Sequence, residues 1–70
     1  MRQVDMILDY MRNVGGITQA QAVKEFGCYR LSARIWDLRH EGHTILKITR
    51  SDTNRYGDPV TFAEYRLVER

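Results

Sequence analysis

The sequence has few of the features that define several common protein classes. It contains one cysteine, Cys28, among 70 residues, so it cannot form an internal disulfide and fits a reducing compartment. No uninterrupted apolar run approaches the roughly 20 residues that a membrane-spanning helix needs. No basic and then apolar leader precedes a cleavage-like site. These absences predict a cytoplasmic chain without a membrane segment.

Residues that could bind a metal or perform catalysis are equally sparse. His40 and His43 are three residues apart and could supply half of the ligands of a metal site. No second cluster of cysteine, histidine or carboxylate residues supplies the other ligands. Cys28 has no evident general base, and we expect this thiol to lie in the core. The chain has no glycine-rich phosphate-binding loop. The sequence therefore predicts no metal, no cofactor, no small-molecule substrate and no enzymatic activity.

The net charge of +2 is small, but the charges are unevenly distributed along the chain. Residues 28–50 carry five basic and two acidic residues, whereas the basic and acidic residues of 1–27 balance and residues 51–70 are slightly acidic. A local basic face is the electrostatic footprint expected of a nucleic-acid binder. An excess of three charges is also common on proteins that bind nothing, so this pattern alone is weak evidence.

Local sequence signals predict two helices in the first part of the chain. In residues 3–14 the apolar side chains recur at helical spacing, and a pair of glycines follows. A second helix is predicted over residues 19–26, because Thr18 and Gln21 have the spacing of a capping box. Gly27 suits the left-handed position that closes a helix.

A third helix is predicted over residues 29–41. Leu31, Ile35 and Leu38 recur at helical spacing and define its buried stripe, and Gly42 ends it. Only two or three residues separate the second and third helices. A turn this short forces the two helices to cross steeply, as in a helix-turn-helix.

After the third helix the pattern changes from helical to extended. Residues 44–50 are rich in β-branched side chains, and residues 60–68 alternate between two faces around a polar, turn-forming segment. The prediction is an α+β fold in one domain, residues 1–70, with three helices followed by a two-stranded β-hairpin wing. The predicted core comprises Ile7, Leu8, Met11, Val23, Phe26, Leu31, Ile35, Leu38, Ile48, Tyr65 and Leu67.

The residues of the helix-turn-helix resemble those of small winged helix-turn-helix proteins of phages and prophages. In that family a T-x-x-x-A helix leads into a G-x-x-x-L-x-A-R-I-x-D-L-R-x-x-G segment, and a hairpin ends in Y-x-L. The corresponding residues here are Thr18, Ala22, Gly27, Leu31, Ala33, Arg34, Ile35, Asp37, Leu38, Arg39, Gly42, Tyr65 and Leu67. The resemblance implies a DNA-binding protein, either a small transcriptional regulator or a recombination accessory protein, in the cytoplasm or nucleoid of a bacterial host.

The outward face of the third helix and the wing supply the candidate contacts to double-stranded DNA. We expect helix 29–41 to enter the major groove and the 50–60 wing to lie on the flanking backbone. Long cations suit phosphate or guanine, hydroxyls suit phosphate, and a small side chain allows close approach to the bases. The candidate residues are Tyr29, Arg30, Ser32, Ala33, Arg34, Lys47, Arg50 and Arg55.

Several alternatives remain open at this point. Arg34 and Asp37 are three residues apart, so an ion pair within the helix would account for both without DNA. Trp36 is expected to be mostly core, packed on the hairpin or the first helix, with a phosphate contact or a partner surface as the alternatives. The wing could be only a solvated turn. Because winged helices also bind proteins, a second copy, another protein or a host enzyme that this chain inhibits could be the partner.

Overall fold

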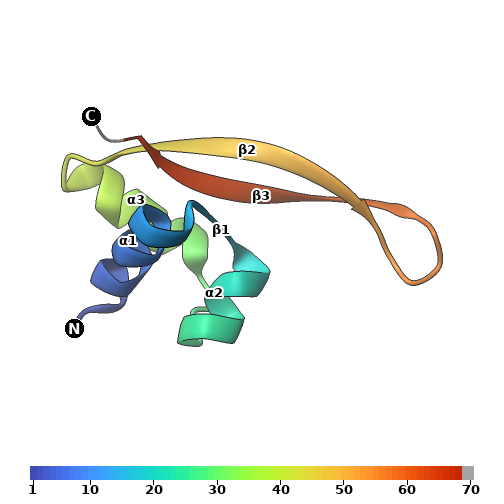
Figure 1. Cartoon of the computed structure of the whole chain (residues 1–70), viewed down its shortest axis with the longest axis horizontal. Coiled ribbons are helices and arrows are strands. Elements are labelled where there is room, and N and C mark those ends of the chain that lie inside the picture. The colour runs from blue at the N-terminus through green and yellow to red at the C-terminus, as the bar shows by residue number, and fades with distance from the viewer. Residues whose placement is uncertain (69–70) are drawn as a thin grey trace.

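A computed structural model describes residues 1–68 of the chain. The elements follow in the order α1 (Gln3–Val14), β1 (Gly16–Thr18), α2 (Gln19–Phe26), α3 (Leu31–His40), β2 (Thr44–Thr53) and β3 (Pro59–Val68). The helices gather at one end of a long β2–β3 hairpin, whose other end projects away from them (Figure 1). This arrangement confirms the predicted α+β winged helix-turn-helix fold.

Both predicted ends of α1 and α2 are confirmed. The capping box at the start of α2 is complete, with the Gln21 backbone N–H donating to Thr18 Oγ1 at 3.3 Å. In return the Thr18 backbone N–H donates to Gln21 Oε1 at 2.9 Å. Gly27 closes the helix at φ 64°, in the left-handed region that favours glycine. Local signals therefore suffice to define α2.

The third helix is shorter than predicted, because it begins at Leu31 rather than at Tyr29 and ends at His40. Arg30 has φ −129° and ψ 59°, outside the helical region. The cap of α3 comes instead from the first residue of α2. Gln19 Oε1 accepts a hydrogen bond from Leu31 N at 3.0 Å, and Gln19 Nε2 donates to the Cys28 carbonyl oxygen at 2.7 Å. Tyr29 and Arg30 therefore lie in the turn and not on the helix.

The sheet has three strands in the order β1-β3-β2, where the sequence predicted only two. The third strand is β1, which pairs antiparallel with β3 from Gly16↔Arg66 to Thr18↔Glu64. The β2–β3 pairing runs without interruption from Thr44↔Val68 to Thr53↔Pro59. Both hairpin strands are thus longer than the predicted 44–50 and 60–68.

Asn54 organises the tip of the hairpin. Its side-chain oxygen accepts from the backbone N–H groups of Tyr56, at 2.9 Å, and of Asp58, at 3.0 Å. Its own backbone N–H donates to the Asp58 carbonyl oxygen at 2.9 Å. These bonds close the loop directly after the last strand pair, so the two strands of the wing are joined by a compact, hydrogen-bonded turn.

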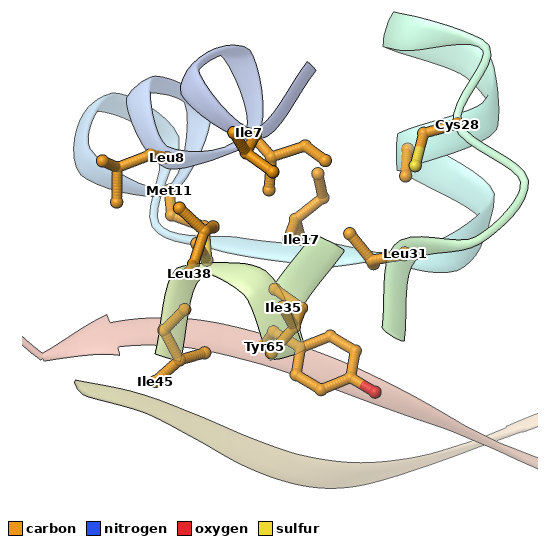
Figure 2. Packing of buried hydrophobic residues seen from close by; sticks show 12 residues of the cluster. Ile7, Leu8, Met11, Ile17, Cys28, Leu31, Ile35, Leu38, Ile45 and Tyr65 are labelled. Atoms are coloured by element: carbon orange, nitrogen blue, oxygen red, sulfur yellow. The ribbon is translucent and has the colours of Figure 1, made fainter. Parts of the chain in front are cut away.

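The core forms between α1, α3 and the base of the hairpin (Figure 2). Most of the predicted residues are buried, and Phe26 and Leu67 pack on the core while partly exposed. Val23 is only half-buried. The buried residues are Val4, Ile7, Leu8, Met11, Ile17, Ala22, Cys28, Leu31, Ile35, Leu38, Ile45 and Tyr65. The expected burial of the Cys28 thiol is thereby confirmed.

The assignment of Ile48 to the core is wrong, because Ile48 faces away from the helices. Ile45 is the buried isoleucine of β2, and it pairs across the hairpin with Leu67. Since side chains alternate along a strand, Ile48 and its partner Glu64 point to the opposite face. We call this opposite surface the outer face. It comprises Leu46, Ile48, Arg50, Asp52, Val60, Phe62, Glu64, Arg66 and Val68, and the inner face holds the alternate residues of β2 and β3.

Candidate nucleic-acid interface

The predicted contacts before and at the start of α3 lie together on the surface. Tyr29, Arg30 and Ser32 are exposed, whereas Ala33 is half-buried. The Arg30 carbonyl oxygen accepts from the backbone N–H groups of Ala33 and Arg34, so this residue is fixed at the helix start although it is not helical. The hydrogen bonds of Gln19 hold the same turn from the other side. The candidate interface thus lies on a hydrogen-bonded turn between α2 and α3.

Gln19 is a positioning residue that the sequence analysis missed. The only signal for it in the sequence is a long amide at the first position of α2, where its side chain reaches back across a short turn. Its bonds to Cys28 and Leu31 place the start of α3 relative to α2. Any ligand that contacts both helices depends on this geometry.

Arg34 is less available than the residues before α3. Its Nη2 lies 3.5 Å from Asp37 Oδ2, so the ion pair suggested by their spacing is confirmed. Both side chains are little more than one-third exposed. The Nε of Arg34 is buried and has no hydrogen-bond partner among residues 1–68. A contact from Arg34 to an external anion would compete with this pair.

Trp36 lies on the surface, and the prediction that it is mostly core is wrong. Its side chain is 59% exposed. The indole stacks on the imidazole of His40, with ring centroids 3.6 Å apart and ring planes inclined by 28°. His40 Nδ1 lies 2.9 Å from the Trp36 carbonyl oxygen, to which it donates in the tautomer protonated at that nitrogen. The hydrophobic stripe of α3 runs along the far side of the helix, which leaves more than half of the Trp36 side chain exposed.

The three basic residues of the hairpin that were predicted to contact DNA lie on different sides of it. Lys47 is exposed on the inner face, on the same side of the sheet as α3, and Arg55 is exposed at the tip. Arg50 stands on the outer face instead. There its Nη2 lies 3.2 Å from Glu64 Oε2. The fold thus groups Lys47 with α3 and separates Arg50 from it.

Glu64 is shared by two guanidinium groups. Arg66 Nε donates to its Oε2 at 2.6 Å, and Arg50 Nη2 donates to the same oxygen. These hydrogen bonds lower the pKa of the Glu64 carboxyl below its ordinary value, and the bond from Arg66 has the larger effect. The charges of Arg50 and Arg66 are therefore partly neutralised within the protein.

Nine of the ten lysine and arginine residues in 1–68, all but Arg12, divide into two groups according to their partners. Arg2, Arg34, Arg50 and Arg66 form ion pairs with carboxylates, and Arg39 donates to the Ile45 carbonyl oxygen at 2.8 Å. Within residues 1–68, four exposed cations have no such partner. They are Lys24, Arg30, Lys47 and Arg55. Lys24, in the last turn of α2, was not selected from the sequence. Unpaired cations can bind phosphate without breaking an internal ion pair.

A groove of about 690 Å³ separates the start of α1 from the neighbouring side of α3. Arg2 bridges its two walls, donating to Asp5 and to Glu41, and this contact lowers the pKa of the Asp5 carboxyl. The groove is lined by Arg2, Gln3, Val4, Arg34, Trp36, Asp37, His40 and Glu41. Its acidic and basic groups largely offset one another, so it lacks the positive potential that a nucleic acid requires.

Two further properties limit what the described residues can do. No helix among them is both long enough and apolar enough to cross a membrane. Nowhere in residues 1–68 do three or more histidine, cysteine or carboxylate side chains come together as metal ligands would.

Comparison with known proteins agrees with this fold. Neither the curated proteins nor the solved structures gave a match. The family model described as a winged helix-turn-helix domain matches residues 2–70, nearly the entire chain. This match, together with the three helices, the three-stranded sheet and the long wing of the structure, shows that the protein belongs to the winged helix-turn-helix domain family.

Proposed function

We propose that the protein binds double-stranded DNA, with the start of α3 in the major groove and the hairpin on the flanking backbone. One observation carries the proposal. Exposed cations without a partner in residues 1–68 lie before α3, at Arg30, and on the hairpin, at Lys47 and Arg55. The winged helix-turn-helix fold, which suits DNA binding, supports the same conclusion.

The residues at the start of α3 have complementary chemical roles. The guanidinium fork of Arg30 matches guanine O6 and N7, and it also matches a phosphate. The hydroxyls of Tyr29 and Ser32 are donors to phosphate oxygens, and the positive end of the α3 dipole favours an anion there. Ala33 is small enough to let the helix approach a thymine methyl.

The remaining predicted contacts rank lower. Arg34 would have to leave Asp37 to reach DNA. Arg50 would have to turn from the outer face, where it bonds Glu64, toward the side of the sheet that bears α3. Lys24 is a better candidate than either, because it is exposed, unpaired within residues 1–68 and located on the other helix of the helix-turn-helix.

We further propose a role of phage or prophage type, as a small transcriptional regulator or a recombination accessory protein in the bacterial cytoplasm or nucleoid. The similarity of the α2–α3 segment to such proteins supports this role. A single module of this kind covers only about 600–1,000 Å² against DNA, which is small for high specificity. Tight binding would therefore require repeated sites, a second copy or a partner protein.

Fluorescence anisotropy with a labelled random duplex tests the proposed DNA binding. If three cations contact phosphates, the slope of log K against log salt is about −2.7. Raising salt from 50 to 200 mM then weakens binding about 40-fold. Absence of binding at 50 mM salt, or binding that does not change with salt, would contradict the proposal.

A second candidate function is a protein-binding module, such as a phage-encoded inhibitor of a host protein. The specific observation in its favour is Trp36, whose exposed indole lies beside the groove between α1 and α3. Tryptophan is enriched among residues that dominate binding energy at protein interfaces. Specific capture of one host protein that is lost on Trp36→Ala, by a chain that does not bind DNA, would support this function over the first.

A further inference from the structure

The outer face of the hairpin carries an apolar surface that no other element covers within residues 1–68. Leu46 is 52% exposed and Phe62 is 41% exposed, and Ile48 between them is half-buried. Val60 and Val68 extend the same surface toward the two ends of β3. Contiguous exposed apolar side chains of this kind mark interaction sites more often than isolated ones do.

The ion pairs of Glu64 order the centre of this surface. Gly16 of β1 lies beneath this carboxylate, and a Cβ at that position would approach Glu64 Cδ to 2.7 Å. Glycine therefore lets the Glu64 side chain lie along the sheet, where Arg66 and Arg50 fix it from both sides. A surface that is ordered before binding loses less entropy when a partner covers it.

We propose that the outer face is the interface between two copies of this chain. Its two cations, Arg50 and Arg66, are matched by two anions, Asp52 and Glu64, so the face has no net charge. A neutral face does not attract nucleic acid, whereas two neutral faces meet without repulsion. A second copy presents the same neutral face.

One arrangement of two copies places no like charges opposite each other. With the two-fold axis parallel to the hairpin, each residue lies over the cross-strand neighbour of its equivalent in the second copy. Arg50 then lies over the second copy's Phe62, a cation–π contact, and Leu46 lies over its Arg66. Ile48 lies over Glu64 of the second copy, whose carboxylate stays bonded to its own Arg50 and Arg66. The contact is isologous, as closed two-fold dimers require.

The dimensions of the face indicate a weak dimer. Strands of ten residues are about 33 Å long, and two strands with their side chains are roughly 14 Å wide. The two copies together would bury about 900 Å², below the roughly 1,200–2,000 Å² of stable interfaces. We therefore expect a monomer at low micromolar concentration and a dimer only at concentrations near the millimolar range.

Dimerisation in this geometry has a consequence for DNA binding. The two hairpin tips point in the same direction, and the two α3 helices lie on opposite sides of the stacked sheets. Two related half-sites on one duplex would suit such an arrangement. This consequence rests on the proposed DNA binding, whereas the dimer itself does not.

Sedimentation equilibrium without DNA, between 10 µM and 1 mM protein, tests the interface. The average mass should rise with concentration from 8.3 kDa toward twice that value. Phe62→Glu, and independently Leu46→Glu on the other strand, should weaken association by at least about tenfold. Val14→Glu is the matched control, because Val14 is 63% exposed at the end of α1 and lies outside this face.

Melting curves establish that each variant is folded, and amide chemical shifts followed on dilution locate the contact. Changes at Leu46, Ile48 and Phe62 support the proposal. A chain that remains monomeric at 1 mM would overturn it. So would equal association of the Phe62→Glu and Val14→Glu variants, or dilution shifts confined to the helices.

Discussion

The turn between α2 and α3 depends on one side chain, and Gln19→Ala tests that dependence. The substitution removes the donor to the Cys28 carbonyl oxygen, at 2.7 Å, and the acceptor for Leu31 N, at 3.0 Å. It also removes the side-chain cap of α3, because Arg30 at the cap position provides none. Both backbone groups are then left to water or without a partner.

The expected loss follows from the two hydrogen bonds. Each hydrogen bond contributes about 1 kcal/mol, and water can replace part of this contribution because Gln19 is exposed. The free energy of unfolding should therefore fall by about 1–2 kcal/mol. In a domain of this size each kcal/mol lowers the melting temperature by roughly 4–8 °C. Gln19→Ala should therefore lower it by roughly 4–16 °C.

Urea denaturation and thermal melting measure this effect, with Gln3→Ala as the matched control. The amide of Gln3 donates to the Phe26 carbonyl oxygen at 3.5 Å, the limit of a hydrogen bond, so its loss should cost less than about 0.5 kcal/mol. Gln19→Glu retains an acceptor for Leu31 N but places a carboxylate against the Cys28 carbonyl oxygen, and it should recover at most part of the loss. If Gln19→Ala and Gln3→Ala melt at the same temperature, the capping role of Gln19 is refuted.

Two further predictions concern the core and the outer face. Ile35→Ala should destabilise the fold by about 2–5 kcal/mol, whereas Ile48→Ala should cost less than about 1 kcal/mol; equal losses in urea denaturation would show that the faces of the hairpin are assigned wrongly. The folded-state pKa of Glu64 lies below its ordinary value of 4.5. Its contribution to stability is therefore complete above that pH and is lost as the pH falls through the lower folded pKa. Denaturation of Glu64→Gln from pH 6 to pH 3 should show a weaker pH dependence than the parent, and identical profiles would count against the shared ion pair.

Elements with signals in their own sequence could be predicted, and those that depend on distant residues could not. The capping box and Gly27 define α2 locally, and its predicted bounds are confirmed. The start of α3 was misplaced because its cap comes from a side chain twelve residues earlier. The strand β1 is too short for any periodicity, and it exists because Gly16–Thr18 pairs with β3 near the other end of the chain.

The candidate site shows the same division. The ion pair between Arg34 and Asp37 follows from helical spacing and is confirmed. The positions of Ile48 and Arg50 depend on which face of β2 meets the helices, and a displacement of one residue reverses every side chain. The burial of Trp36 was predicted wrongly because helical spacing gives only the angle between its side chain and the buried stripe. Spacing does not tell which other elements pack on the helix at that angle. Contacts of the individual residues with DNA stay predictions.

The central claim, that the start of α3 contacts DNA, is tested most directly by comparing two single arginine substitutions in salt titrations of duplex binding. Arg30→Ala removes an exposed cation with no ion pair in residues 1–68, and Arg2→Ala removes an exposed cation bound to Asp5 and Glu41. Both variants lose one positive charge, and both should melt close to the parent. Arg30→Ala should weaken binding and reduce the salt slope by about one, or relax discrimination at one base pair by about 1–3 kcal/mol if it reads guanine. Arg2→Ala should retain the slope of the parent. Equal affinities and slopes for the two variants would contradict the assignment of α3 as the DNA-contacting helix.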